Sequence, residues 1–507
     1  MLKYFLDKFY PLRFIGLLGG LFVFFLILNL KIDPSEPMIG RTLAVAALMA
    51  IWWITEAVPI AATALLPIVL FPLLGISDGK TVSSAYANHI IFLFIGGFVM
   101  ALAMERHNLH KRIALRVLMW TGSGYKRLLL GFMLATAFLS MWMSNTATVM
   151  MMLPIANSII LKFEEDEGKE NVKRISIGLM LGIAYSASAG GIATLIGTPP
   201  NPAFTKIFSI MFPAAPEISF SQWMLFGFPV SIFMLFFSWL LISQMYRSKN
   251  KMKTNLTVFR TQYKELGKMR FEELVVLIAF VLLAVLWITR SGFDFGTVVI
   301  PGWASIFGNP KYINDGTVAI GVSLILFLIP SNLKKGDRIL ELDVLNKLPW
   351  GIIILFGGGF ALAGGFVDSG LSLWLGEKLK AIGHLDPIVI IFVIALFMSF
   401  LTEITSNTAT TQILLPVLAG LAISIKINPY LLMLPATVAA SLAFMLPVAT
   451  PPNAIVFGSG RLKIADMVKT GFWLNLIGVF VTTLVSYYWG QYVFDIDINS
   501  LPAWMGL

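Results

Sequence analysis

The pentapeptide SNTAT occurs twice in this chain, at Ser144–Thr148 and at Ser406–Thr410, 262 residues apart. The same offset relates three further pairs: FIGGF at 94–98 with FGGGF at 356–360, Pro154 with Pro416, and the hydroxyl residues Ser140 and Thr402. Self-similarity at a fixed offset indicates that one structural unit has been used twice. The polar SNTAT motif therefore belongs to a duplicated unit.

A second motif, TPPN, recurs at Thr198–Asn201 and Thr450–Asn453 with an offset of 252. The shorter offset is explained by the charged segment FEEDEGKENVKR, predicted as a loop that only the first copy contains. We interpret the chain as two related halves, 1–246 and 271–507, joined by a basic cytoplasmic linker at 247–270. An odd number of spans in each half places the halves in opposite orientations, as in inverted-repeat transporters.

The composition predicts an all-α polytopic membrane protein. Of 507 residues, 57% are hydrophobic and 13% charged, compared with roughly 25% charged in soluble domains, and mean hydropathy is +0.83. This composition argues against a soluble enzyme. The net charge of +10 does not require a nucleic-acid partner, because basic residues in cytoplasmic loops explain it. The chain has no cysteine, so disulfides and thiolate metal sites are excluded.

Eleven apolar segments are predicted as spans, and they lie at about 14–30, 42–55, 57–75, 89–104, 178–203, 223–245, 272–289, 316–330, 350–367, 430–456 and 470–491. With the N-terminus cytoplasmic, 28 of the 37 Lys and Arg residues fall on the cytoplasmic side, as the positive-inside rule requires. The C-terminus is then outside. We expect a multi-pass protein of the plasma (inner) membrane, surrounded by lipid.

Two further apolar stretches, 127–161 and 387–423, carry the SNTAT motifs near their middles. Each limb is too short to span comfortably, and polar residues within lipid must face protein or a cavity. We interpret both stretches as re-entrant hairpins with Ser-Asn-Thr at the tip. Interhelical hydrogen bonding is the alternative role for a single such motif, but its duplication favours a binding function.

The TPPN motifs predict broken helices at 178–203 and 430–456. Proline lacks an N–H and clashes with the preceding turn, so the carbonyls just before each Pro-Pro pair lack helical partners and suit a hard cation. The restarting helix presents free N–H groups and a positive dipole end, which suit an anion.

Apart from Arg127 at the edge of the first hairpin stretch, the motif-bearing segments contain no Arg or Lys to neutralise an anion. A carboxylate is instead expected to be held by Asn145, Thr146, Asn407 and Thr408, by helix N-termini and by bound cations. Ser140 with Ser144, and Thr402 with Ser406, are spaced i and i+4 on one helix face. Their oxygens suit Na⁺, so the residues favour a cation-coupled anion symporter.

Two acidic residues, Glu56 and Glu403, are predicted to lie deep in the membrane. Intramembrane acids are functional candidates, but bracing of hairpin or loop amides is the favoured interpretation of both. No histidine lies near a motif serine, and no paired carboxylates are apparent. An intramembrane enzyme is therefore not expected.

Together with WWITEAVPI at 52–60, the doubled motifs resemble those of the divalent anion/sodium symporters, the INDY-type sodium/dicarboxylate transporters, along nearly the whole chain. The resemblance implies a homodimer in which a scaffold domain is fixed and a transport domain moves as an elevator, the two being interleaved in sequence. It also implies symport of succinate, fumarate or malate with two or more Na⁺ and no organic cofactor. The alternatives are a sodium-independent dicarboxylate exchanger and a transporter of citrate or sulfate.

Carried over position by position, the resemblance implies one sodium site at Ser140, Ser144, Asn145 and the Gly197 carbonyl. It implies a second at Thr402, Ser406, Asn407 and the Ala449 carbonyl. The substrate is expected to contact Asn145, Thr146, Asn407, Thr408, Thr198, Thr450 and Pro451.

Overall fold

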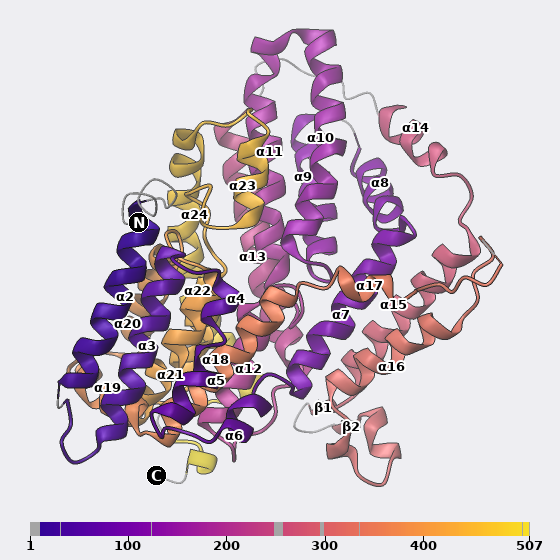
Figure 1. The fold of residues 1–507 in the computed structure, drawn as a ribbon. Coiled ribbons are helices and arrows are strands. Elements are labelled where there is room, and N and C mark those ends of the chain that lie inside the picture. Colours follow the sequence, from indigo (N-terminus) through magenta and orange to yellow (C-terminus); the bar gives the residue numbers. More distant parts are fainter. Residues whose placement is uncertain are drawn as a thin grey trace, which may run out of the picture.

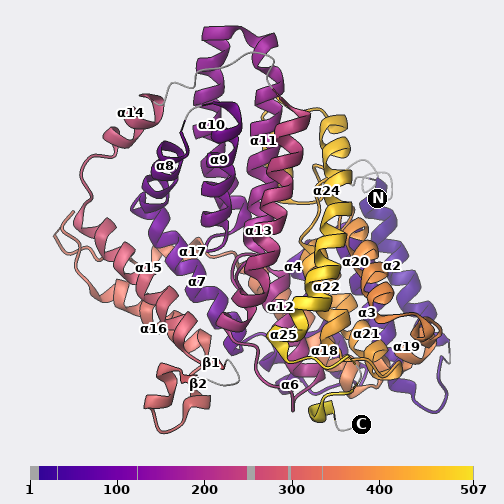
Figure 2. The same ribbon diagram turned by 180° about the vertical axis from the view of Figure 1, so that it is seen from behind.

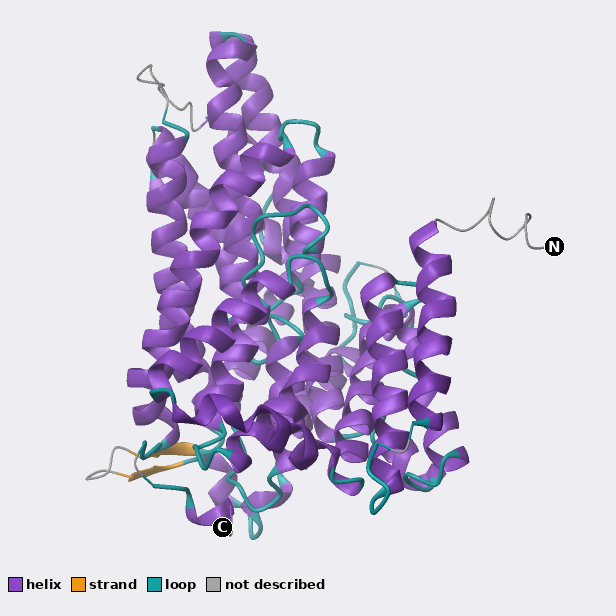
Figure 3. Cartoon of the chain, turned by 90° about the vertical axis from the view of Figure 1, so that its left-hand side faces the viewer, coloured by secondary structure: helices purple, strands orange, loops and turns teal. Residues whose placement is uncertain are grey.

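The computed structural model confirms the predicted all-α class. It describes residues 11–30, 32–122, 124–247, 257–294, 299–333, 335–498 and 500–505. Within these ranges most residues are helical. Two short strands, β1 Gly292–Asp294 and β2 Val299–Pro301, form an antiparallel pair in which Phe293 is opposite Ile300 (Figure 3).

The helices of the first half are α2 Pro11–Asn29, α3 Pro37–Thr55, α4 Ile60–Thr63, α5 Leu66–Leu73, α6 Gly79–Ser84, α7 His89–Arg106, α8 Leu109–Thr121, α9 Tyr125–Ser140, α10 Asn145–Glu167, α11 Lys169–Gly191, α12 Pro200–Met211 and α13 Phe220–Met245. The predicted linker contains a helix, α14 Thr257–Glu265, and its residues 248–256 lie outside the described ranges.

The helices of the second half are α15 Phe271–Thr289, α16 Asp315–Leu328, α17 Asp343–Asn346, α18 Trp350–Asp368, α19 Leu371–Leu379, α20 Pro387–Leu401, α21 Asn407–Ser424, α22 Tyr430–Ala440, α23 Pro451–Gly458, α24 Ile464–Leu484 and α25 Gly490–Phe494. A π-helical turn, Val485–Trp489, joins α24 to α25. Short 3₁₀ turns lie at Trp303–Ile306, Pro310–Tyr312, Lys380–His384 and Ala503–Met505.

Nine helical stretches among the described residues are long and apolar enough to cross a membrane, and four shorter apolar helical stretches accompany them. The nine include α10 and α21, so the expectation that each hairpin limb is too short to span is wrong for these two limbs. The span predicted at 57–75 is not one continuous helix. It is divided into α4 and α5, because Pro59, Pro67 and Pro72 fall within it and each removes a backbone donor.

The charged segment FEEDEGKENVKR is helical rather than a loop. It extends α10 to Glu167 and begins α11 at Lys169, with the turn at Gly168, whose φ is +84°. Lys162 pairs with Glu165 and Asp166 at spacings of three and four residues, which stabilises an exposed helix. The loop prediction failed because a run of charged residues indicates only that a segment is exposed to solvent, and an exposed helix satisfies this as well as a loop does.

The SNTAT segments form two helix–turn–helix units, α9/α10 and α20/α21 (Figure 1). The first unit continues into α11 at the upper end of the view, whereas the second follows α19 at the lower end. The two units therefore enter the bundle from opposite ends. The start of α2 and the final described turn, Ala503–Met505, likewise lie towards opposite ends.

The hairpins and broken helices of the two halves interlock. Helix α12 packs on α21, and α23 packs on α10 and α11. Seen from behind, α13 lies between α11 and α24 (Figure 2). A smaller hydrophobic core joins α2, α3 and α5 to α18, while much of α2 exposes large apolar side chains, as a lipid-facing helix does.

Candidate functional site

The tip of the first hairpin forms a compact cluster of polar atoms. The inward-pointing amide atom of Asn145 lies 2.5 Å from Ser140 Oγ, 3.1 Å from the Ala187 carbonyl oxygen and 3.2 Å from the Gly197 carbonyl oxygen. Gly191 lines the same space, since a Cβ there would stand 2.7 Å from that amide atom. The structure thus brings together Ser140, Asn145 and Gly197, whereas the hydroxyl of Ser144, the fourth residue of the expected set, accepts the Ala147 N–H at 3.2 Å. It adds the carbonyl of Ala187, which carries no side-chain signal in the sequence.

The two orientations of the Asn145 amide have different consequences. With nitrogen inward, it donates to all three oxygens. With oxygen inward, four oxygens converge, an arrangement that a hard cation stabilises because Na⁺ and Ca²⁺ sites are built from carbonyl and hydroxyl oxygens. This donor set fits a sodium ion.

The second hairpin repeats the pairing of a hydroxyl with an asparagine amide. Thr402 Oγ1 donates to Asn407 Oδ1 at 2.5 Å and lies 3.0 Å from the Ala440 carbonyl oxygen. Ser406 precedes the first residue of α21, as Ser144 precedes that of α10. Ala449 lies buried in the break between α22 and α23, and its role as a sodium ligand stays a prediction.

The asparagine of each TPPN motif braces its own break, a role that we did not predict. Asn201 Nδ2 donates to the carbonyls of Gly191 at 3.1 Å and Thr194 at 2.7 Å. Asn453 Nδ2 donates to those of Ala443 at 3.2 Å and Leu446 at 3.0 Å. The two asparagines and their carbonyl partners are each related by 252 residues, which is the offset of the TPPN motifs. That offset is the sequence signal from which this bracing role could have been found.

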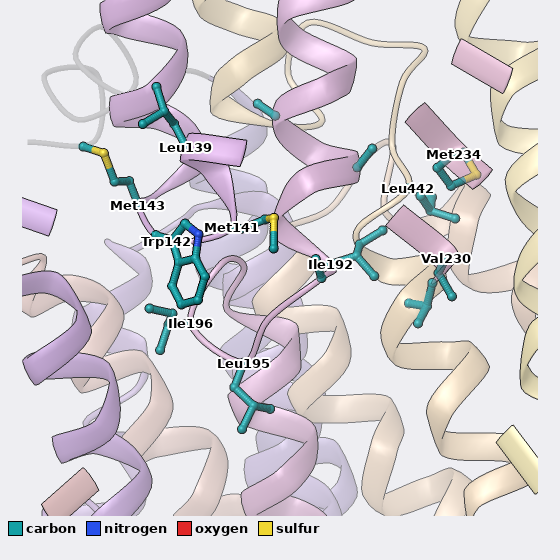
Figure 4. Packing of buried hydrophobic residues seen from close by; sticks show 14 of the residues in the cluster. Leu139, Met141, Trp142, Met143, Ile192, Leu195, Ile196, Val230, Met234 and Leu442 are labelled. Atoms are coloured by element: carbon teal, nitrogen blue, oxygen red, sulfur yellow. The ribbon is translucent and has the colours of Figure 1, made fainter. Parts of the chain in front are cut away.

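The two breaks are tied to their hairpin tips by different groups. In the first half, Thr194 Oγ1 donates to the Met141 carbonyl at 2.5 Å, and the side chains of Trp142 and Met141 lie towards Ile196 and Ile192 (Figure 4). In the second half, Glu403 occupies the position of Met141 and accepts N–H groups from three consecutive residues of the break.

Glu403 is buried and its carboxylate is surrounded by donors. Oε1 accepts from the backbone N–H of Phe444 at 2.7 Å and of Met445 at 2.9 Å, and Oε2 from that of Leu446 at 2.9 Å. Asn475 Nδ2 on α24 donates to Oε1 at 2.7 Å. Four donors satisfy an ionised carboxylate, so the interpretation that Glu403 braces loop amides is confirmed.

Glu56, in contrast, is not deeply placed. It ends α3 with a φ of +47°, is exposed, and lies 3.5 Å from Arg13. The prediction failed because Glu56 is flanked by apolar residues in the sequence, although α3 ends at Thr55 and the backbone up to Pro59 is not helical. Among the described residues, no group of three His, Asp or Glu side chains is arranged to hold a metal ion.

Four helix N-termini belong to the predicted anion site: those of α10, α21, α12 and α23. Thr146 and Thr408 are the second residues of α10 and α21. Thr198 is buried just before α12, and Thr450 caps α23 through its Oγ1, 3.3 Å from the Asn453 N–H. Pro451 begins α23 and is exposed. Free N–H groups at such ends attract anions.

Paired hairpins, paired broken helices and oxygen clusters at their ends define an inverted-repeat secondary transporter. The sodium:sulfate symporter transmembrane region matches residues 17–496. The chain belongs to this family, the divalent anion/sodium symporters, which confirms the resemblance seen in the motifs. It is therefore a multi-pass membrane protein.

The chain is 46% identical to the sodium-dependent dicarboxylate transporter SdcS of Staphylococcus saprophyticus, over 96% of this chain and 93% of the relative. The Staphylococcus aureus protein of the same name is also 46% identical, with the same coverage. These relatives are transporters.

Two solved structures share the fold. The YdaH transporter of Alcanivorax borkumensis has a TM-score of 0.55 at 16% identity, covering 88% of this chain and 98% of its own. MtrF of Neisseria gonorrhoeae has a TM-score of 0.55 at 11% identity, covering 92% and 96%.

Proposed function

We propose that this chain imports C4-dicarboxylates such as succinate, fumarate and malate by symport with Na⁺. The observation that carries the proposal is the duplicated pair of a hydroxyl and an Asn amide at the start of a half-helix, with backbone carbonyl oxygens beside it. The printed function of the staphylococcal relatives supports the same substrate and ion.

The two asparagines are proposed to serve ion and substrate together. The Oδ1 atoms of Asn145 and Asn407 face the sodium ligands, leaving their amide N–H groups to donate to a substrate carboxylate. Thr146, Thr408, Thr198, Thr450 and Pro451 complete the substrate site. Because the tips and breaks contain no Arg or Lys, sodium ions and helix dipoles supply the compensating charge.

The proposed moving body comprises α9–α13 and α20–α24, within a homodimer fixed by the remaining helices. Side chains tie this body together across the halves. Arg461 binds Glu164 at 2.6 Å, and Tyr185 Oη donates to the Phe444 carbonyl at 2.8 Å. A body braced in this way suits elevator movement, with the N-terminus cytoplasmic and the C-terminus outside.

Uptake of labelled succinate into empty proteoliposomes tests the proposal. An inward Na⁺ gradient should drive accumulation, and choline should not. Excess unlabelled succinate should compete, whereas citrate and sulfate should compete weakly. Uptake that ignores Na⁺ but requires internal dicarboxylate identifies an exchanger instead, and stronger competition by citrate or sulfate reassigns the substrate.

Removing the hydroxyl at either sodium cluster should affect the ion more than the substrate. Ser140→Ala and Thr402→Ala each delete an oxygen 2.5 Å from the Asn amide. We expect the Na⁺ concentration for half-maximal uptake to rise several-fold, about tenfold for each 1.4 kcal/mol lost. Succinate affinity at saturating Na⁺ should change little. An effect confined to succinate affinity refutes the assignment of these hydroxyls.

A further inference from the structure

Each GGF motif places a pair of glycines at the boundary between the proposed moving body and the helices around it. The pairs are Gly96 and Gly97 in the first half and Gly358 and Gly359 in the second. The first glycine of each pair packs against a neighbouring fixed segment. A Cβ on Gly96 would lie 2.5 Å from Cβ of Ala319 on α16, and one on Gly358 would overlap Ala64 after α4. These contacts explain why the two positions are small.

The second glycine of each pair faces the moving body. A Cβ on Gly97 of α7 would stand 3.1 Å from the side chain of Ile196, in the break before α12. A Cβ on Gly359 of α18 would overlap the side chain of Gln412 on α21. Equivalent glycines thus contact non-equivalent elements: a break in the first half and a hairpin limb in the second.

The repeat offsets identify the counterparts of these partners. Ile196 corresponds to Val448, and Gln412 corresponds to Met150. The exposures of the pairs are reversed. Ile196 is 7% exposed and Val448 80%, whereas Gln412 is fully buried and Met150 57% exposed. The hairpin tips differ in the same way as Ile196 and Val448, because Trp142 is 8% exposed whereas its counterpart Ile404 is 66% exposed.

The exposed face of α10 borders open space. A cavity of about 700 Å³ lies between α8, α10 and α14 and is lined by Ala147, Met150 and Pro154. The corresponding residues of α21 are Ala409, Gln412 and Pro416, and all three are buried. One hairpin limb is thus packed where its counterpart is free.

Gln412 is buried without hydrogen bonds in this arrangement. Neither Nε2 nor Oε1 has a partner among the described residues. A buried unpaired amide costs free energy, so this contact opposes the arrangement that contains it. Hydration of the amide in a second arrangement would remove that cost.

We infer that Gly97 and Gly359 are contact points over which the moving body exchanges partners during transport. In the alternate state, Gly97 packs on Met150 and Gly359 packs on Val448, while Ile196 and Gln412 are released. The inference rests on the proposed function, because it requires the moving body described above. It adds which residues touch in each state and assigns Gln412 the role of destabilising the present one.

The geometry of one slide accounts for both exchanges. Met150 lies six residues beyond Ser144, roughly 9 Å along α10 at 1.5 Å per residue. A displacement of that order along the helix axis carries Met150 towards Gly97 and Gln412 away from Gly359. Because both glycines lack side chains, neither helix obstructs the passing limb.

Disulfide trapping tests the inference directly, because the chain has no native cysteine. The pair Gly97→Cys/Ile196→Cys should cross-link the present state. The pairs Gly97→Cys/Met150→Cys and Gly359→Cys/Val448→Cys should cross-link the alternate state, since a disulfide needs Cα atoms within about 7 Å. Each bond, formed with copper phenanthroline, should stop succinate uptake until it is reduced.

The matched control is Ile95→Cys/Met150→Cys, whose first cysteine lies on another face of α7 and should not cross-link. If Gly97→Cys/Met150→Cys fails to cross-link while its Na⁺-driven uptake persists, the exchange of partners is wrong and the symport proposal stands. If the cysteine-free parent shows no Na⁺-driven uptake, the symport proposal itself fails.

A substitution at Gln412 provides a second test, in which neither hairpin limb carries a cysteine. Gln412→Met copies the residue at the corresponding position of α10 and removes the unpaired amide. In the Gly97→Cys/Ile196→Cys background it should raise the initial rate of cross-linking, which reports occupancy of the present state. An unchanged or lower rate contradicts the role assigned to Gln412.

Discussion

Asn145→Ala and Asn407→Ala are each expected to abolish Na⁺-dependent uptake at normal membrane abundance. Each substitution removes an amide placed 2.5 Å from the Ser140 or Thr402 hydroxyl and proposed to contact sodium and substrate together. Truncating one partner of a buried charged contact costs about 2–5 kcal/mol, which is roughly 30-fold or more in affinity. Loss of both contacts should leave no measurable transport.

The measurement is initial succinate uptake in proteoliposomes at equal protein content. Asn171→Ala is a suitable control, because Asn171 is exposed and donates only to the Glu167 carbonyl near the α10–α11 turn. It should retain uptake. Near-normal transport by either Asn145→Ala or Asn407→Ala would refute a site built from both hairpin tips.

Glu403→Ala is expected to lower the stability of the folded protein more than any other substitution named above. It leaves three backbone N–H groups and the Asn475 amide without their acceptor. Each buried donor left unpaired costs about 1–3 kcal/mol. The break between α22 and α23, which includes Ala449 and Thr450, should lose its fixed geometry, and uptake should fall with it.

Thermal unfolding in detergent, measured alongside uptake, separates this effect from a direct role in transport. The midpoint should fall by several degrees for Glu403→Ala and less for Glu403→Gln, which keeps one acceptor oxygen. Glu56→Ala is the matched control, because Glu56 is exposed and surface substitutions usually change stability by about 0.5 kcal/mol or less. An unchanged midpoint for Glu403→Ala would show that the four hydrogen bonds do not stabilise the break.

The sequence was informative wherever a residue pattern was duplicated. Helices end or begin at both SNTAT and both TPPN motifs, where the duplicated patterns suggested hairpin tips and breaks, and Ser140 lies beside Asn145 as Thr402 lies beside Asn407. The partners that reach the site through the backbone or through packing could not be predicted. The Ala187 carbonyl has no side-chain signature, and the donors to Glu403 come from residues some 40 positions away.

Errors arose where two physical tendencies compete. The segment at 163–174 is rich in charge, which suits a loop and an exposed helix equally, and the helix is formed. The WWITEAVPI segment is apolar enough to span a membrane, but Pro59 allows Glu56 to end a helix at an exposed position. The different packing of the two related tips cannot be read from motifs that are nearly identical.

In the proposed site, sodium ions rather than basic side chains allow a dianion to bind. Binding of a dianion without sodium would leave uncompensated charge in a poorly solvated site. Coupling between ion and substrate is reciprocal, so succinate should tighten Na⁺ binding by the same factor. Typical couplings between sites are roughly 5- to 150-fold, and we expect this one to be at the upper end or beyond.

Calorimetric titration of the purified protein with succinate, first in sodium and then in choline buffer at equal ionic strength, measures this coupling most directly. We expect saturable binding in sodium and binding too weak to detect in choline. Equal succinate affinity in the two buffers would contradict this expectation, because the anion site would then exist independently of sodium.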